Sequence, residues 1–196
     1  MNKSLIFAFL FLTVATFTHA QTSSGNLMFG GGIDFSSNSR QADNNNTYSS
    51  VSFTPSAGYF ISDNFAVGLS FTIASEKSGV DPNRSTENTF GMGPFARYYF
   101  FTSNEQFAIF GQAGLSLATE KDTNGAGFVT KSSSTTFSLF PGAAYFFNEH
   151  WAVELSITGF QMTSYDPNKD NDNDKSTFVN FGLHTFSPTL GFRYHL

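Results

Sequence analysis

The sequence contains no cysteine, few charged residues and, beyond its N-terminal segment, no apolar run long enough for a transmembrane helix. Without cysteine the chain can form neither disulfide bonds nor thiolate metal sites, so hydrogen bonding and packing must hold the fold together. Charged residues make up 13% of the 196 residues, about half of the roughly 25% that is usual in soluble domains. The net charge of −5 and the lack of a basic patch argue against nucleic-acid binding.

The N-terminus has the three parts of a secretory signal peptide. A lysine precedes an apolar run from Leu5 to Val14, and Thr18 and Ala20 put small residues at the −3 and −1 positions of a cleavage site. A retained transmembrane helix would need roughly 18 or more apolar residues, and this run is shorter. We therefore expect residues 1–20 to be a signal peptide that the secretion translocon reads, and residues 21–196 to form one domain.

Aromatic residues, including 26 phenylalanines, make up 17% of the chain, and large apolar residues recur with a period of two. They occupy one face of each alternating stretch, and small or polar residues occupy the other. This pattern predicts β-strands with two different faces. It is clearest over residues 27–35, 65–74, 107–117 and 151–158.

A proline-centred repeat joins these stretches into a larger pattern. Its members are Pro55, Pro94, Pro141 and Pro188, which lie 39, 47 and 47 residues apart, and an aromatic residue always follows four positions later. Propeller blades have similar periods but hold four strands each, whereas each unit here has room for two. The repeat therefore predicts four two-stranded units.

Short and long connections alternate along the chain. A polar turn of a few residues follows each of the first three repeats, and polar segments of 14 to 17 residues lie within 36–49, 75–88, 119–133 and 161–177. Such alternation is typical of outer-membrane barrels, whose short turns are periplasmic. We therefore predict an all-β fold for residues 21–196, an eight-stranded antiparallel up-and-down transmembrane β-barrel of the bacterial outer membrane. Its termini are expected in the periplasm and its long loops outside the cell.

A soluble eight-stranded barrel alternates as well, with its apolar face inward, and charge distinguishes the two. A soluble exterior needs charged residues interspersed along its strands. The small face of the expected strands carries only Asp34, Arg97, Glu154 and Arg193. Four charges are too few to solvate an exterior, but they can pair inside a narrow lumen while the apolar face meets outer-membrane lipid. Aromatic clusters such as residues 98–101 suit the interfacial girdle of a membrane barrel.

The C-terminus carries the most specific motif of the chain. Its residues Thr189, Gly191, Tyr194 and Leu196 look like the polar-x-Gly-x-x-aromatic-x-hydrophobic signal that the barrel assembly machinery reads, with leucine in place of the usual terminal phenylalanine. From Gly25 onward the chain resembles the small eight-stranded outer-membrane barrels, such as the OmpA transmembrane domain, OmpX and OmpW, and the porin-like outer-membrane barrel proteins of Bacteroidetes. The resemblance implies a Gram-negative outer-membrane protein inserted by that machinery.

The lumen of an eight-stranded barrel is just wide enough for side chains to fill. Glu154 is expected opposite Arg193 on a neighbouring strand, with Arg97 able to join them. We interpret this cluster as a buried ion pair that neutralises polar groups, and a gate on a narrow ion path remains the alternative. Alternation also assigns six aromatic side chains to the lumen, so we expect no wide aqueous pore: Phe60, Phe95, Tyr99, Phe110, Phe140 and Phe146.

These features favour a structural or surface-interacting barrel with a largely plugged lumen, which meets an unknown ligand through its loops. A narrow porin-like channel for small solutes is the alternative. A lipid-acting enzyme is a remote alternative, because only His184 is expected where such barrels do chemistry and no serine or acid can be tied to it. We therefore predict no enzymatic activity, no catalytic residue and no cofactor.

Two further motifs have simpler explanations than the binding sites they suggest. The acidic segment 166–174 carries oxygen ligands at alternate positions, as calcium sites do, but it lacks the glycine and glutamate of an EF-hand. We interpret it as a solvated surface loop. The glycine run at residues 30–32 suggests a phosphate-binding loop, but no helix follows, so strand glycines are the better interpretation. No metal site is predicted.

Overall fold

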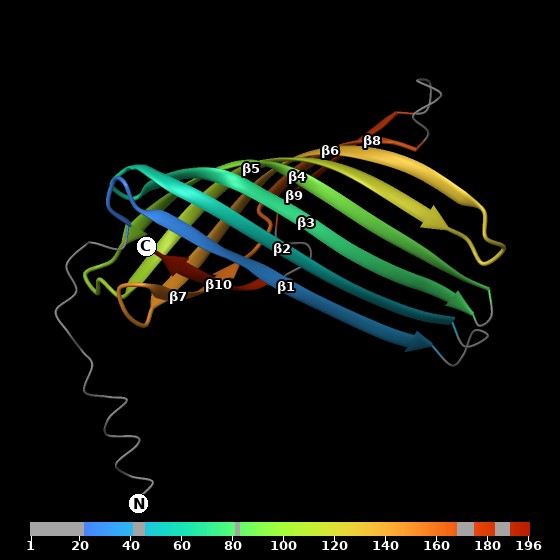
Figure 1. Cartoon of the computed structure of the whole chain (residues 1–196), viewed down its shortest axis with the longest axis horizontal. Helices are drawn as coiled ribbons and strands as arrows, with labels where there is room; N and C mark the ends of the chain where they lie inside the picture. The colour runs from blue at the N-terminus through green and yellow to red at the C-terminus, as the bar shows by residue number, and fades with distance from the viewer. Residues whose placement is uncertain (1–21, 41–45, 81–82, 168–174, 183–188) are drawn as a thin grey trace, which may run out of the picture.

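The computed structural model describes residues 22–40, 46–80, 83–167, 175–182 and 189–196, which form an antiparallel β-sheet closed into a barrel (Figure 1). No helix in this part of the chain is long and apolar enough to cross a membrane. The strands are β1 (Leu27–Arg40), β2 (Asn46–Ser62), β3 (Phe65–Val80), β4 (Asn83–Phe101), β5 (Phe107–Thr123), β6 (Val129–Phe146), β7 (Trp151–Ser156), β8 (Phe160–Asp166), β9 (Ser176–Phe181) and β10 (Thr189–His195).

The ten strands form a ring with eight positions, which confirms the predicted fold class. Strands β1 to β6 pair in sequence order, and β6 then pairs with both β7 and β8. Because β8 continues the path of β7 along β6, and β9 pairs with β8 while β10 pairs with β7, these four segments fill two positions of the ring. The ring closes where β1 pairs with β10, from Met28 opposite His195 to Gly32 opposite Gly191.

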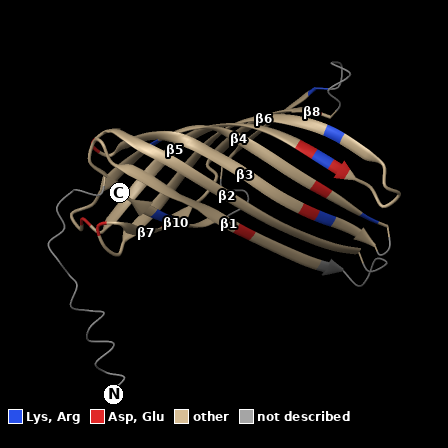
Figure 2. Cartoon of the chain, in the orientation of Figure 1, with Lys and Arg blue, Asp and Glu red and all other residues tan. Residues whose placement is uncertain are grey.

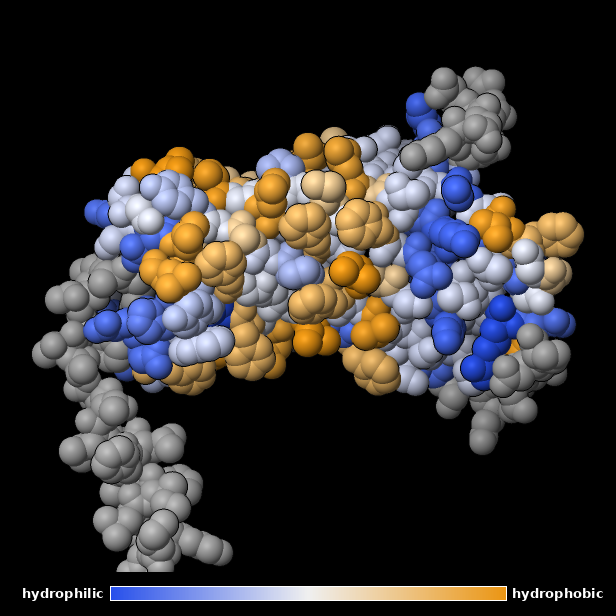
Figure 3. Space-filling view, in the orientation of Figure 1, coloured by the Kyte–Doolittle hydropathy of each residue, from blue (hydrophilic) through white to orange (hydrophobic). Residues whose placement is uncertain are grey.

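Alternation along the strands separates an apolar exterior from a tightly packed interior. On β4, Phe95, Arg97 and Tyr99 are buried, whereas the intervening Tyr98 and Phe100 are 41% and 55% exposed. On the face that Figure 3 shows, apolar residues gather over the middle of the barrel, and the exposed apolar side chains of the strands form an apolar belt. We define this belt by its exposed members, which include Phe53, Tyr59, Leu69, Ile73, Phe90, Tyr98, Phe100, Ile109, Leu115, Leu117, Leu139, Leu155, Leu190 and Phe192.

The two ends of the barrel differ in the length of their strands. We call the end with the connections 63–64, 102–106 and 147–150, where Leu196 also lies, the turn end, and the opposite end the loop end. At the loop end the strands run well past the apolar belt, and most of the charged residues of the strands lie there (Figure 2).

The prediction of long loops at 36–49, 75–88, 119–133 and 161–177 was wrong in extent. β1 continues to Arg40, β3 to Val80 and β5 to Thr123, so much of each polar segment is strand. The change from apolar to polar residues marks the edge of the belt and not the end of a strand. Serine and threonine can continue the same backbone ladder beyond the belt, as the pairing of residues 119–123 with residues 129–133 shows.

The repeat prolines share one structural role at the middle of the barrel. The ladder between β2 and β3 passes from the Phe53–Ile73 pair to the Ser56–Ser70 pair, around Pro55. The ladder between β4 and β5 likewise skips Pro94, and Pro141 lies where β6 passes from β7 to β8. Because proline has no N–H to donate, each of these three prolines interrupts the ladder on one side of its strand. Pro188 lies outside the described residues.

Substitutions on one face of β3 test the position of the apolar belt. Leu69 lies at its middle, whereas Ser75 faces outward beyond Ile73. We expect Leu69→Arg to destabilise the barrel in lipid vesicles by about 2–4 kcal/mol and Ser75→Arg by about 0–1 kcal/mol, because the cost of a lipid-facing charge depends on depth. Urea unfolding, followed by the fluorescence of the single tryptophan, Trp151, gives both values. Equal losses would show that the belt does not face lipid.

Candidate functional site

Three charged side chains from distant strands meet inside the barrel. Arg97 of β4, Glu154 of β7 and Arg193 of β10 form a charged layer whose side chains are only 5–6% exposed. Arg97 Nη1 lies 2.6 Å from Glu154 Oε1, and Arg193 Nη2 lies 2.9 Å from Glu154 Oε2. Arg193 Nε also donates to both carboxylate oxygens at 3.3 Å. One carboxylate therefore serves two guanidinium groups.

The expected pairing register of this layer was wrong by two residues. Glu154 lies opposite Gly191, and Arg193 lies opposite Ala152. The two side chains still meet because arginine is long enough to reach along the strand to its diagonal neighbour. The absence of a side chain at Gly191 leaves the space beside Glu154 open.

Two polar residues that the sequence analysis did not assign to the cluster also accept hydrogen bonds from Arg97. Its Nε donates to Gln112 Oε1 at 2.8 Å and its Nη1 to the Tyr99 hydroxyl at 2.9 Å. The Tyr99 hydroxyl in turn donates to Glu154 Oε1 at 3.0 Å. The guanidinium carbon of Arg97 lies 4.1 Å from the centre of the Phe110 ring, which adds a cation–π contact. Alternation predicts that these side chains face the lumen, but it does not predict that they lie at the same position along the barrel axis.

Gly30 on β1 leaves space for the side chain of Arg193. A Cβ atom at Gly30 would come within 3.1 Å of Arg193 Cδ and also collide with the backbone of β10. Beside it, Arg193 Nη1 donates to the Ser56 hydroxyl at 2.7 Å. Gly30 is therefore a strand glycine at a close approach, in agreement with the interpretation of the glycine run.

An aromatic layer closes the lumen between the charged layer and the turn end. Phe60, Tyr99, Phe146 and His195 are each 0–1% exposed. Their rings pack against one another with centroids 5.3–6.3 Å apart. Phe95 and Phe110 are buried as well, as alternation predicted. The part of the barrel between the charged layer and the turn end is therefore a packed core.

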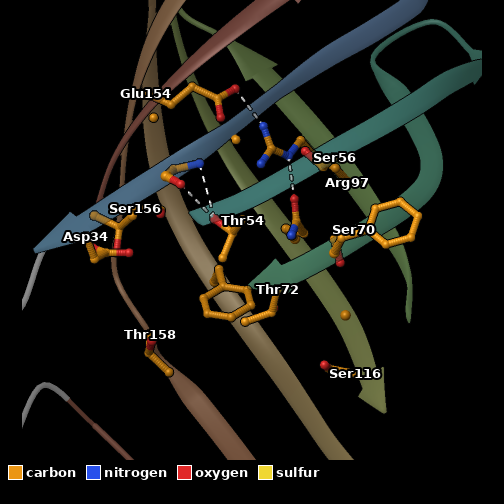
Figure 4. Close-up of a pocket in the computed structure, with 18 of the residues that line it drawn as sticks. Asp34, Thr54, Ser56, Ser70, Thr72, Arg97, Ser116, Glu154, Ser156 and Thr158 are labelled. Carbon is orange, nitrogen blue, oxygen red and sulfur yellow. Dashed lines mark hydrogen bonds and ion pairs between the residues drawn. The ribbon is translucent and has the colours of Figure 1, made fainter. Parts of the chain in front are cut away.

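On the other side of the charged layer lies a polar cavity of about 240 Å³, which we call the cup (Figure 4). Its floor is the charged layer, and Phe140, expected in the lumen, is part of its wall. Asp34 also lines the cup, but it is exposed and forms no ion pair with any residue that the structure describes. Hydroxyl side chains are the most frequent kind in the wall, namely Thr54, Ser56, Ser70, Thr72, Ser116, Thr136, Ser156, Thr158 and Thr189.

Four inward-facing carboxylates form an acidic collar at the loop end: Glu76, Glu87, Glu120 and Asp122. Glu87 of β4 lies directly opposite Glu76 of β3 and Asp122 of β5. Partial burial raises the pKa of Glu87, and the charges of Glu120, Glu76 and Asp122 raise it further. Within the described ranges, no group of three or more His, Cys, Asp or Glu residues is arranged to hold a metal ion.

The remaining predicted residues fall into two groups. Residues 1–20, His184 and most of the acidic segment 166–174 lie outside the described residues, although Asp166 lies 3.7 Å from Lys175. The C-terminal motif is described: Thr189 and Gly191 line the cup, Tyr194 packs against Trp151, and Leu196 exchanges two backbone hydrogen bonds with Leu27. Recognition of this motif by the assembly machinery stays a prediction.

Removing the shared carboxylate should be costly. Glu154→Gln keeps the shape of the side chain but leaves two buried guanidinium groups without a counter-charge, and we expect a loss of about 3–5 kcal/mol in the free energy of unfolding. The control is Asp34→Asn, which breaks no ion pair and should change stability by less than about 0.5 kcal/mol. Urea unfolding in lipid vesicles measures both variants. A neutral Glu154→Gln would contradict the central place of the charged layer.

Repulsion within the acidic collar should make stability depend on pH. Because folding raises the pKa of Glu87, the folded barrel loses stability as pH rises through that pKa, and the loss is absent below the pKa of the unfolded chain. Glu87→Gln should therefore raise stability by about a few tenths of a kcal/mol at neutral pH and have no effect near about pH 3. Urea midpoints at the two pH values test this, with the exposed Glu149→Gln as the control. An equal gain at both pH values would rule out the repulsion.

Solved structures of other proteins are similar to this barrel. The chain matches no curated protein sequence. Among solved structures it is similar to the outer membrane protein OprG from Pseudomonas aeruginosa, with 15% identity, a TM-score of 0.53 and coverage of 90% of this chain and 98% of that chain. The N-terminal β-barrel domain of Pseudomonas aeruginosa OprF gives 14% identity, a TM-score of 0.49 and coverage of 88% and 98%.

The likeness to OprG concerns the fold, whereas the match to a family covers most of the sequence. The family described as "Outer membrane protein beta-barrel domain" matches residues 6–185. This match agrees with the closed ring of eight strands and with the apolar belt. The chain therefore belongs to the outer membrane protein β-barrel domain family.

Proposed function

We propose that the protein is a structural or surface-interacting barrel of the outer membrane whose lumen is closed to solutes. The observation that carries this proposal is the double closure of the lumen. The charged layer spans the interior from β4 to β7 and β10, and the aromatic layer fills the space between it and the turn end. A solute would have to displace both layers to pass.

The same proposal places the turn end in the periplasm and the loop end outside the cell. Short connections are periplasmic in barrels of this kind. Strands that continue beyond the apolar belt, with charged and hydroxyl side chains, suit an aqueous exterior, and they would carry an unknown surface ligand. The secretion translocon would deliver the chain to the periplasm, and the barrel assembly machinery would insert it through the motif that ends at Leu196.

A narrow channel is the second candidate, and the cup favours it. The cavity already provides space on the loop side of the charged layer, and its floor consists of side chains that can change partners. Movement of Arg193 away from Glu154 would thin the charged layer, although the aromatic layer beneath it would also have to move. No enzymatic role is proposed, since the remote lipid-acting alternative depends on His184, which the structure does not describe.

Liposome swelling separates the closed barrel from the channel. Proteoliposomes that contain the purified barrel, exposed to an isotonic solution of a small sugar such as arabinose, should swell no faster than protein-free liposomes. Arg193→Ala should leave this rate unchanged if the aromatic layer alone suffices to close the lumen. A porin in the same lipids serves as the positive control.

The possible outcomes distinguish the closed barrel, the open channel and the gate. Measurable solute flux through the unmodified barrel would refute the closed lumen. Flux that appears only in Arg193→Ala would show that the charged layer is the gate. Conductance that stays at zero for both proteins in planar bilayers would exclude the gate.

A further inference from the structure

We propose that the cup is a binding site for a small monovalent oxyanion, such as a short carboxylate, held on the guanidinium groups of its floor. The proposal goes beyond the closed barrel described above, because it assigns the cavity a ligand whether or not the lumen conducts. It depends on the charge of the floor, the geometry of its donors and the shape of the cup.

The charged layer has one positive charge more than its internal pairing can balance. Arg97 and Arg193 share the single carboxylate of Glu154. Both oxygens of that carboxylate are already occupied: Oε1 accepts from Arg97, Tyr99 and Arg193, and Oε2 accepts twice from Arg193. Because a buried charge without a counter-charge is unfavourable, the layer favours an additional anion.

The anion can approach this layer from one side only. On the side of the turn end, the aromatic layer packs directly against Arg97, and Tyr99 is fully buried. Toward the loop end, Arg97 and Arg193 form the floor of a cavity of about 240 Å³. The counter-charge must therefore occupy the cup.

The donors at the floor suit a planar oxyanion. Arg97 uses Nε and Nη1 in the bonds to Gln112, Tyr99 and Glu154, whereas its Nη2 donates to none of the described residues. Guanidinium nitrogens bind carboxylate oxygens with directional, charge-assisted hydrogen bonds. The hydroxyl groups of Thr54 and Ser56 also line the cup, but they donate to the backbone carbonyls of Gly32 and Gly30, so the guanidinium group of Arg97 is the principal donor for the ligand.

Negative charge farther up the lumen limits the ligand to a small, singly charged species. Asp34 lies four residues beyond Gly30 on β1, about 13 Å along the strand at roughly 3.3 Å per residue. The acidic collar lies nearer still to the loop end. A polyanion or a long anion would meet these carboxylates, whereas a short anion at the floor balances one positive charge without reaching Asp34.

Two leucine substitutions on β5 form a matched test of the cup. A Cβ atom at Gly114, which lines the cup, has no contact closer than 3.9 Å, so Gly114→Leu adds a side chain to the cavity without a collision at Cβ. A Cβ atom at Gly111, which points to the outer face of the same strand, has no heavy atom within 4 Å. Gly111→Leu therefore adds the same side chain outside the cup. Heat-modifiable migration on gels verifies that each variant is folded.

The measurement is ¹⁹F NMR of trifluoroacetate added to the full barrel in non-ionic detergent micelles. We expect concentration-dependent broadening with the unmodified barrel and with Gly111→Leu, at least tenfold weaker binding with Gly114→Leu, and no broadening of the uncharged probe trifluoroethanol. Equal binding by the two leucine variants, or equal binding of the two probes, would overturn the proposal.

Charge and ligand source are tested in the same assay. Arg97→Gln leaves Arg193 and Glu154 as a neutral pair, so it should abolish trifluoroacetate binding, and retained binding would contradict the role of the excess charge. Competition by acetate, but not by equal concentrations of chloride, would identify an organic carboxylate as the ligand class. Displacement by chloride alone would overturn the oxyanion assignment.

Discussion

Closure of the sheet between β1 and β10 is the constraint on which the other features depend. An open sheet in lipid would leave edge N–H and C=O groups unpaired, at a cost of several kcal/mol each. The pairing from Met28 to Gly32 with His195 to Gly191 covers that edge over five residues of β1. It also requires a close approach of the two backbones, because a Cβ atom at Gly30 would collide with β10. The glycine run is therefore part of the closure.

Closure also determines which interactions are available inside. A ring with eight positions brings β4, β7 and β10 within reach of one another across a narrow lumen, so side chains far apart in sequence share one layer. The long arms of Arg97 and Arg193 meet the carboxylate of Glu154 near the centre. Tyr99 belongs to both layers, since its hydroxyl contacts the ions and its ring packs with Phe60 and Phe146. The charged and aromatic layers thus support each other.

The sequence was sufficient to predict which face of a strand a residue occupies, but not its position along the barrel axis. Period-two alternation identified Phe60, Tyr99 and the other lumen residues because face depends only on parity. Position along the axis depends on the pairing register between strands, which explains why Glu154 and Arg193 are diagonal rather than opposite neighbours. The strand ends were missed for a related reason: polar side chains replace apolar ones at the edge of the belt, while the backbone ladder continues.

The lumen charges follow an order along the barrel axis that the strand extensions make possible. Positive charge is concentrated at the charged layer, deep in the lumen, and the carboxylates of the acidic collar face inward beyond the belt. On the same strand extensions Lys77, Lys121 and Lys131 occupy the alternate, outward positions and are exposed. On these extensions, alternation therefore places carboxylates on the inner face of the wall and lysines on its outer face. Because the strands extend beyond the belt, the acidic collar lies between the loop end and the cup, and the guanidinium groups lie at the bottom of the cup. The distribution of charge inside the barrel is therefore asymmetric along its axis, although both ends of the barrel are polar.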